Sequence, residues 1–252
     1  MRFPDHFLWG AATSAYQVEG GNAAADWWDW EQATGRESSG AACRHYDLYP
    51  QDFDLAKELG HNAHRFSVEW SRIEPEEGVF SPEALKHYID VVLFLKSRGI
   101  EPIVTLHHFT NPLWLARLGG WENKRTVKRF ARYVDVVACA LAPHVRYWVT
   151  INEPTVYAVY SYLFGIWPPQ GKSLARVFRA QRTLAAAHIL AYGRIRKIYD
   201  QLKLEQPRIG ISQFTHAFVP CTSGVRDRLA AWAREKWVNL GFLDEIARHG
   251  AV

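Results

Sequence analysis

Tyr-Trp-Val-Thr-Ile-Asn-Glu-Pro, residues 147–154, is a short apolar run that ends in an amide, a carboxyl group and a proline. β-Branched and aromatic residues over this length predict a buried strand at 147–151, and Pro154 cannot continue the hydrogen-bonded ladder of a strand. The sequence therefore places Asn152 and Glu153 side by side at the carboxyl end of a strand.

Outward from this strand, the same kind of run recurs four times, and helical patterns separate the runs. The clearest helix spans 81–98, because its apolar residues follow helical spacing and Ser81-Pro82-Glu83 is a capped start. Strands that alternate with helices predict a parallel sheet with crossover helices, which is an α/β fold. The other expected strands are 8–14, 63–68, 101–106 and 208–214, and the other expected helices are 51–59, 124–141, 174–202 and 225–248.

The number of strand-helix units bears on the architecture. A closed (β/α)8 barrel needs eight units, and the 252 residues hold five. We therefore expect an incomplete (β/α)8 TIM barrel made of about the first five strand-helix units. Residues 1–252 should form a single domain, since no linker, low-complexity stretch or repeat divides them. Two unpaired strand edges and an exposed apolar interior would need cover, from a complementing C-terminal fragment or from oligomerisation.

Composition narrows the class of function. The net charge of +4 comes from 30 basic and 26 acidic residues scattered along the chain, whereas a nucleic-acid reader needs a concentrated basic stripe. Asp5 and His6 lie where a signal peptide would be apolar, and no run is long enough to span a membrane. Three cysteines without paired spacing fit a reducing compartment. We expect no nucleic-acid partner, no membrane and a cytoplasmic location.

Aromatic residues are unusually common, with 11 Trp, 11 Tyr and 13 Phe. They suit a large core or a cleft that stacks against flat ligand faces such as sugar rings. In barrels of this kind reactive groups gather at the carboxyl ends of strands. A carboxyl group placed there among aromatics should have a raised pKa and can act as a general acid. Glu153 is therefore the candidate catalytic residue, and the alternative is that it only caps the following segment.

Four strings carry a family resemblance. Trp-Val-Thr-Ile-Asn-Glu-Pro at 148–154 closely resembles the acid/base signature of glycoside hydrolase family 1, and Phe-Pro-Asp-His-Phe-Leu-Trp-Gly at 3–10, with its continuation to Gly20, resembles the other signature of that family. Residues 62–73 and 105–112 resemble the second and third strand ends of the same family. The resemblance covers essentially the whole chain.

This resemblance implies a retaining β-glycosidase of the β-glucosidase type that acts on a β-glucoside or a β-linked oligosaccharide, with no cofactor and no metal. Glu153 would be the acid/base, and Asn152 would bond the sugar 2-hydroxyl. Gln17 and His108 would hold hydroxyls on the far side of the glycone ring, and Arg65 would support the nucleophile. From the residues alone, Gln17 and Arg65 could equally be ordinary buried polar groups, and His107 could face the pocket in place of His108.

Some positions depart from the family pattern. Phe109 stands where many members have tryptophan, so an indole donor is lost while an apolar wall remains. Glu69 is either a second carboxylate at the barrel mouth or the partner of an arginine, and we expect the arginine pair. The Trp-Trp-Asp-Trp run at 27–30 resembles structural loop packing more than a sugar platform.

The family nucleophile lies in a Thr-Glu-Asn-Gly type string, and the chain contains none. Glu122-Asn123 is a decoy, because its surroundings resemble the loop after the third strand. We therefore expect a chain truncated at its C-terminus, without a nucleophile of its own. Two alternatives are a non-catalytic sugar-binding remnant and one half of a split enzyme that another chain completes.

Overall fold

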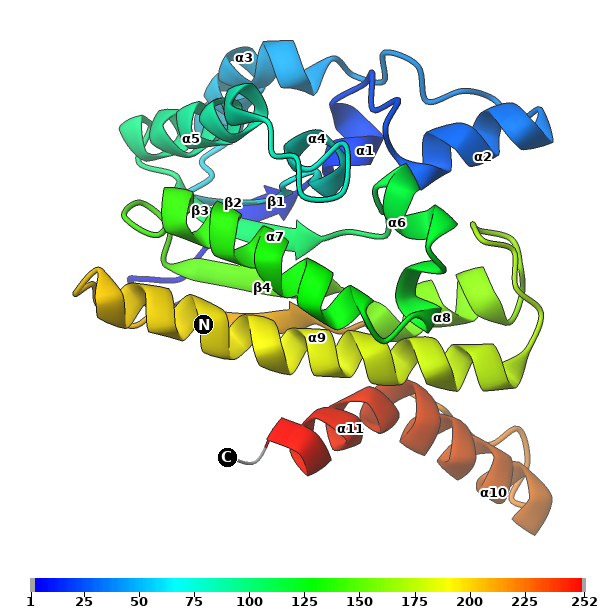
Figure 1. Cartoon of the computed structure of the whole chain (residues 1–252). Coiled ribbons are helices and arrows are strands. Elements are labelled where there is room, and N and C mark those ends of the chain that lie inside the picture. The colour runs from blue at the N-terminus through cyan, green and yellow to red at the C-terminus, as the bar shows by residue number, and fades with distance from the viewer. Residues whose placement is uncertain (1–2, 251–252) are drawn as a thin grey trace.

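The centre of the molecule is a five-stranded parallel sheet, in a computed structural model that describes residues 3–250. Figure 1 shows the strands side by side in the order of the chain, with the long helices packed along the sheet. The prediction of an α/β fold with five strand-helix units is confirmed, and β1 and β5 form the two edges of the sheet. The strands are β1 (Gly10–Ala12), β2 (Ala63–Ser67), β3 (Glu101–His107), β4 (Tyr147–Asn152) and β5 (Arg208–Ser212).

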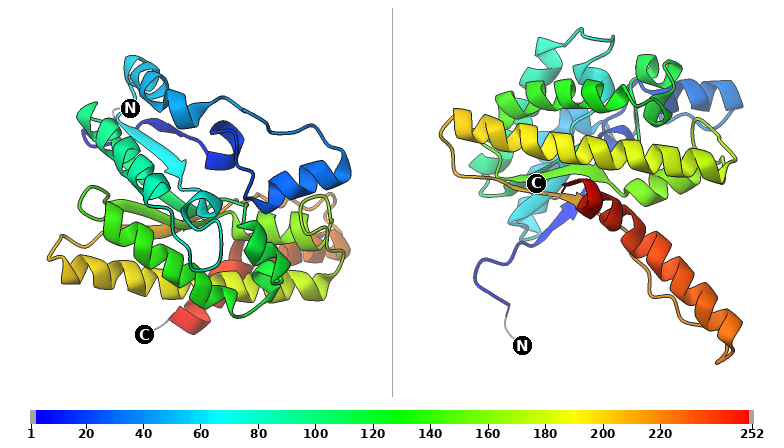
Figure 2. Two further views of the ribbon diagram at one scale, coloured as in Figure 1. Left: turned by 45° about the horizontal axis from the view of Figure 1, so that its top comes forward. Right: turned by 60° about the horizontal axis from the view of Figure 1, so that its bottom comes forward.

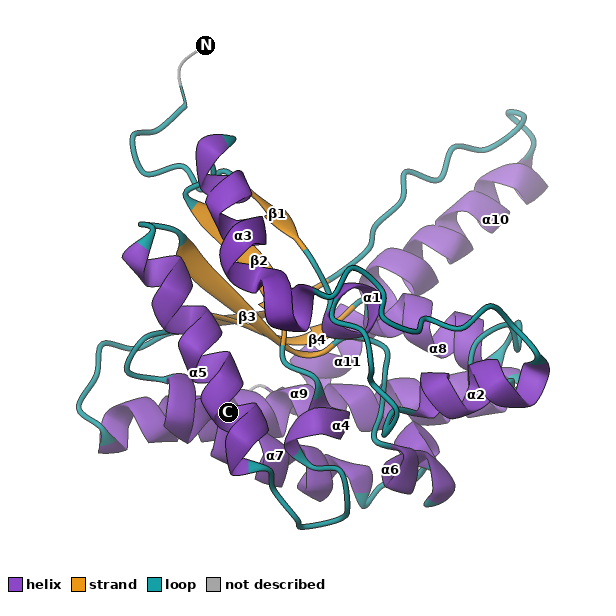
Figure 3. Ribbon diagram, turned by 90° about the horizontal axis from the view of Figure 1, so that it is seen from above, coloured by secondary structure: helices purple, strands orange, loops and turns teal. Residues whose placement is uncertain are grey.

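Four long helices connect successive strands, and Figure 3 shows them gathered on one side of the curved sheet. Parallel strands need such crossovers, which run in the same sense each time and so cover the same face. The helices are α3 (His45–Glu58), α5 (Pro82–Ser97), α7 (Thr126–Leu141) and α9 (Leu174–Gln201). Ser81 caps α5 by accepting from the backbone N–H of Ala84 at 3.1 Å, and Pro82 occupies the first helical position, as the sequence predicts.

The core lies between the sheet and these helices. Phe66, Val104 and Trp148, which lie on adjacent strands, are almost completely buried. Trp148 donates its indole N–H to Tyr199 on α9 at 2.9 Å, so that α9 is tied to β4. A Trp148→Ala change would cost about 3–5 kcal/mol of stability. The residues that alternate with these on the strands, Arg65, Ile103 and Val149, stay partly exposed on the other face.

The C-terminal segment differs from a simple helix. The expected helix at 225–248 is present as α10 (Val225–Arg234), a π-helical stretch η2 (Glu235–Leu240) and α11 (Gly241–Gly250). Figure 2 shows α10 pointing away from the body, and none of its residues is buried. The chain then returns, and α11 packs against α9. No helix among residues 3–250 is both long and apolar enough to cross a membrane.

Several expected boundaries are wrong. The first strand is three residues long rather than seven, and β5 ends at Ser212 because β4, its neighbour in the sheet, ends at Asn152. The first long helix begins at His45 rather than at residue 51, and Pro50 lies in its second turn, where the missing N–H removes one backbone hydrogen bond. Short helices after the strands were not expected: α1 (Ala15–Val18), α2 (Asp26–Thr34), α4 (Trp70–Ile73), α6 (Leu113–Arg117), η1 (Gly120–Glu122) and α8 (Pro154–Tyr162).

Candidate active site

Glu153 lies between the end of β4 and the start of α8. Its backbone is left-handed, with φ 45° and ψ 57°, and its N–H donates to the carbonyl of Ser212 at 2.7 Å. A residue other than glycine rarely adopts this conformation unless its surroundings hold it. Glu153 occupies the N-cap position of α8, but its carboxyl group makes no capping hydrogen bond. The carboxyl group is therefore free for a role other than capping.

The pKa of Glu153 reflects two opposing causes. Partial burial raises the pKa of its carboxyl group above the ordinary value, and the nearby Arg65 guanidinium lowers it. Burial is the larger effect, so that the protonated form is favoured more than in a free glutamate. A carboxyl group with a raised pKa is better suited than a free glutamate to donate a proton as a general acid.

Three of the predicted site residues form a row beside Glu153. Arg65 on β2 donates Nη1 to Oδ1 of Asn152 at 2.8 Å, and Asn152 Nδ2 lies 3.3 Å from Nε2 of His108. The pKa of His108 is lowered to about 3, mainly by burial and also by Arg65 and His107, so the imidazole is neutral and can accept at Nε2. The ends of β2, β3 and β4 thus bring a guanidinium, an imidazole and an amide together.

The two adjacent histidines have different surroundings. His107 is buried in the core, where its Nε2 lies 3.2 Å from Asn111 Oδ1 and 3.2 Å from Trp121 Nε1. His108 is the imidazole that lies beside Asn152. Gln17 lies on α1, directly after β1, and its side chain is exposed. Within residues 3–250 Gln17 makes no side-chain hydrogen bond to another predicted site residue, and it is not a buried polar group.

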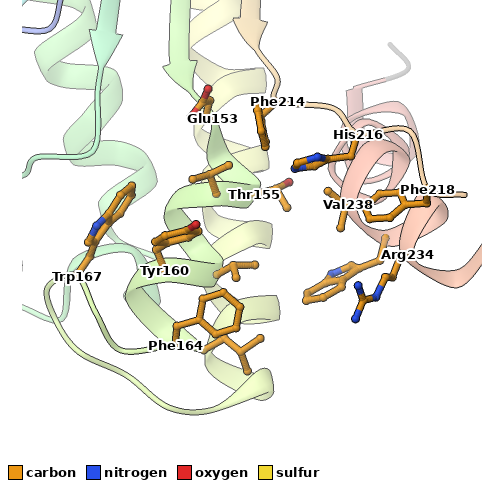
Figure 4. Close-up of a pocket in the computed structure, with 14 residues that line it drawn as sticks. Glu153, Thr155, Tyr160, Phe164, Trp167, Phe214, His216, Phe218, Arg234 and Val238 are labelled. Carbon is orange, nitrogen blue, oxygen red and sulfur yellow. The ribbon is translucent and has the colours of Figure 1, made fainter. Parts of the chain in front are cut away.

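A cavity of about 650 Å³ adjoins Glu153. Figure 4 shows Tyr160, Phe164 and Trp167 on one wall and His216 and Phe218 on the other, with Glu153 at one end. The first wall comes from α8 and the loop after it, and the second comes from the chain after β5. Such an apolar space with one ionisable group suits the body of an organic ligand.

Phe109 connects the row of polar residues with this cavity. Its ring centroid lies 4.8 Å from that of Trp167, and its ring is nearly parallel to that of Tyr157 at 6.5 Å. Its backbone is left-handed, with φ 72°. Trp27 also packs against Trp167, with ring centroids 5.3 Å apart, and it contacts Trp30 at 5.4 Å. Trp27 and Trp30 of α2 are therefore part of the packing around the site.

The expected pairing of Glu69 with an arginine is wrong. Glu69 is buried, and its carboxylate accepts from the hydroxyl of Ser71 at 2.7 Å and from that of Thr110 at 2.9 Å. No arginine lies within ion-pair distance of it in the described part of the chain. Burial raises its pKa, and neutral hydroxyls compensate for the lost hydration. Glu69 therefore ties the end of β2 to the loop after β3.

Sequence reasoning missed the residues that surround the site from the loops. Trp167, Phe214 and His216 line the cavity, and Asp26 and Asn111, which bind each other, line a second pocket. The high aromatic content was a signal for the first group. Nothing in the sequence indicates the pairing of Asp26 with Asn111 across 85 positions.

Known proteins resemble this chain along its whole length. Residues 1–251 match the model described as Glycosyl hydrolase family 1. Beta-glucosidase A of Thermotoga maritima is 33% identical over 98% of this chain and 57% of its own length. A 6-phospho-beta-galactosidase of Clostridium acetobutylicum is 31% identical over 91% of this chain and 49% of its own.

Solved structures of β-glycosidases also resemble this chain. The beta-glycosidase from Pyrococcus horikoshii matches with a TM-score of 0.88 and 40% identity, over 96% of this chain and 55% of its own. The Thermotoga maritima beta-glucosidase in complex with deoxynojirimycin matches with a TM-score of 0.88 and 31% identity, over 94% of this chain and 55% of its own. The chain spans about half the length of the relatives it matches.

Proposed function

Since the chain belongs to glycosyl hydrolase family 1, whose members are β-glycosidases, we propose that it carries the acid/base half of a retaining β-glycosidase acting on β-glucosides or related β-linked sugars. The observation that carries this proposal is the uncapped carboxyl group of Glu153, with a raised pKa, beside the row of Arg65, Asn152 and His108. A single polar residue at one strand end would be weak support for a binding site. Four residues from three strand ends with complementary chemistry support a site for a polar ring.

In the proposed reaction Glu153 protonates the departing glycosidic oxygen while a second carboxylate attacks the anomeric carbon. The glycosyl-enzyme bond is then broken by water, from which Glu153 takes the proton that it gave up. Asn152, His108 and Gln17 hold the sugar hydroxyls, and Arg65 supports the attacking carboxylate. Phe109 supplies an apolar wall on the glycone side. The leaving group lies in the apolar cavity beside Glu153.

The second carboxylate is proposed to come from outside these residues. A retaining pair lies about 5 to 5.5 Å apart. Glu153 is the only carboxyl group among the residues of the described chain that line the 650 Å³ cavity. The three remaining strands, in another segment or another chain, would supply the nucleophile and cover the edges at β1 and β5.

Hydrolysis of an activated aryl β-glucoside tests the proposal. We expect no turnover by the purified chain alone, and turnover after mixing with a fragment that carries the last three strands of a related family member. Glu153→Gln should abolish the restored activity, while Glu122→Gln, at the decoy, should not. Activity of the isolated chain that Glu153→Gln removes would show instead that a carboxylate in this chain replaces the nucleophile.

The second candidate is a sugar-binding remnant, favoured by the presence of Gln17, His108 and Asn152 in a chain without the nucleophile motif. It predicts binding of deoxynojirimycin by the chain and no turnover with any complementing fragment.

A cytoplasmic location is also part of the proposal. It is supported by Cys43, Cys139 and Cys221, which are all free and exposed, as suits a reducing compartment.

A further inference from the structure

The two residues that follow Phe109 are each held by a buried carboxylate from a neighbouring loop. Thr110 donates to Glu69, as described above, and Asn111 is bound to Asp26 at the start of α2. The backbone N–H of Asn111 donates to Asp26 Oδ1 at 2.9 Å, and Asn111 Nδ2 donates to Asp26 Oδ2 at 2.8 Å. In return, the backbone N–H of Asp26 donates to the carbonyl of Asn111 at 2.8 Å. The loop after β1 is thus fastened to the loop after β3.

The side chain of Asn111 extends this connection to two further elements. Its Oδ1 accepts from Trp121 Nε1 at 2.8 Å and faces Nε2 of His107, and its Nδ2 also donates to the hydroxyl of Tyr157 at 3.0 Å. Tyr157 lies on α8, one turn after Glu153. Asn111 is therefore the point at which the loops after β1 and β3, η1 and α8 meet.

The buried carboxylate of Asp26 destabilises the fold unless specific hydrogen bonds compensate for its lost hydration. It is 6% exposed, burial raises its pKa to about 7, and no lysine or arginine lies within ion-pair distance in the described residues. Buried carboxylates without a cationic partner are costly and are rarely kept as packing. Both of its oxygens are used by Asn111. Each carboxylate oxygen of Asp26 thus faces one N–H donor of Asn111.

We propose that Asp26 is a positioning residue: by holding Asn111, it fixes where His108 and Phe109 lie on the glycone side of Glu153, and so sets the affinity for the sugar. This inference rests on the proposed function. Phe109, two residues before Asn111, has a left-handed backbone, and a non-glycine residue keeps this conformation only where its surroundings hold it. His108 is the residue that accepts from Asn152 at 3.3 Å, and a small displacement of the loop would break that contact.

A double-mutant cycle in the full chain tests the proposal. Asp26→Asn turns one of the two acceptors that face Asn111 into a donor, and Asn111→Asp creates the opposite mismatch. The double change Asp26→Asn with Asn111→Asp swaps donor and acceptor, so that an amide at position 26 can again pair with a carboxylate at position 111, to which the Tyr157 hydroxyl can donate. Asp29→Asn, an exposed position of the same helix, is the matched control.

Two readouts are needed. The first is the imidazole NMR signal of His108 in histidine-labelled protein, assigned with His108→Gln. The second is the affinity for deoxynojirimycin. We expect each single variant to shift the His108 signal and to weaken binding about tenfold, and the swapped pair to restore both to near the starting values. A merely structural pair would change the melting temperature without moving the His108 signal.

Unchanged His108 signals and affinity in folded single variants would overturn the proposal, as would a folded swapped pair that behaves no better than the single variants. If Asp26→Asn does not fold, Tyr157→Phe replaces it, because this change removes one hydrogen bond from Asn111 and keeps the ring. An unmoved His108 signal in that variant would also contradict the positioning role. If the unmodified chain binds no sugar mimic, the proposed function is in question, while the His108 signal still decides the positioning role.

Discussion

The surroundings of Glu153 act on its pKa in opposite directions. Its backbone is left-handed, its carboxyl group is half-buried, and Arg65 nevertheless stabilises the ionised form. A general acid that must also act as a base needs both states within reach of the working pH. Burial favours the protonated state of Glu153, and the guanidinium favours the ionised state.

Removal of the guanidinium should therefore change the titration of Glu153. We expect Arg65→Met to raise the pKa of Glu153, because the cation lowers that pKa at present and the effect of burial would remain. Carboxyl ¹³C chemical shifts followed with pH, with Glu153 assigned by Glu153→Gln, measure it. Arg65→Lys keeps the charge and should leave the value nearly unchanged. A pKa that falls in Arg65→Met would show that the Coulombic effect is assigned with the wrong sign.

The sequence predicts those residues of the site that are neighbours in the chain. It does not predict the contacts between residues that are far apart in the chain. Asn152 and Glu153 are adjacent in a strand that ends at Pro154, so their position at the mouth follows from one short string. Of the two hydroxyl partners of Glu69, Ser71 is local, but Thr110 lies 41 positions away on another loop. Residue type alone suggested an arginine for Glu69, because a buried carboxylate usually has a cation, and here hydroxyls take that place.

At the scale of elements, the long helices and strands were predictable and the short helices at the strand ends were not. Pro154 illustrates the reason. A proline after a strand marks its end, but the same proline is well suited to the first turn of a helix, and here it opens α8. The choice between a loop and a helix depends on what α8 packs against, which includes Phe109 from the loop after β3, whose ring lies beside that of Tyr157.

The contact between α9 and β4 gives a pH dependence of stability. His188 on α9 lies 2.7 Å from the hydroxyl of Thr150 on β4, and burial lowers its pKa from 6.5 to about 4. The unfolded chain therefore binds a proton at His188 below pH 6.5, whereas the folded chain does so only near pH 4. Acidification through this window should reduce the free energy of unfolding by up to roughly 3 kcal/mol from this residue.

The measurement is urea unfolding at several pH values between about 7 and 4, which span the two titrations. His188→Gln removes the titrating group and should make the free energy of unfolding fall less steeply with acid than in the unchanged chain. His6→Gln, at an exposed histidine, is the control. An equally steep fall in His188→Gln would mean that the buried imidazole does not contribute.

At the scale of the whole molecule, the sheet has two open edges and a face that helices do not cover. Beside β1, three rings form a cluster with centroids within 4.8 Å of one another: Phe3, Phe7 and Trp9 are 53%, 39% and 48% exposed. An exposed aromatic cluster at a strand edge favours association with another chain.

We therefore expect the isolated chain to self-associate with increasing concentration through this edge. Phe7→Ser with Trp9→Ser should move the sedimentation profile toward monomer, because it removes most of the exposed aromatic surface there. Leu59→Ser, at a leucine that is 77% exposed on the helical side, should have no such effect. Equal self-association in all three proteins would place the contact elsewhere.

The order of the strands has a consequence for how the molecule forms. Each strand pairs only with the strands that come before and after it in the chain, from β1 to β5. During synthesis every new strand can therefore dock on an edge that is already complete, without waiting for a segment still to be made. Each step must still close a crossover connection that contains a long helix, but no step has to close a loop longer than the segment between two successive strands. At every stage the nascent sheet also presents one fresh edge, so the time between successive strands is the period in which a ribosome-bound chain is most exposed to mispairing.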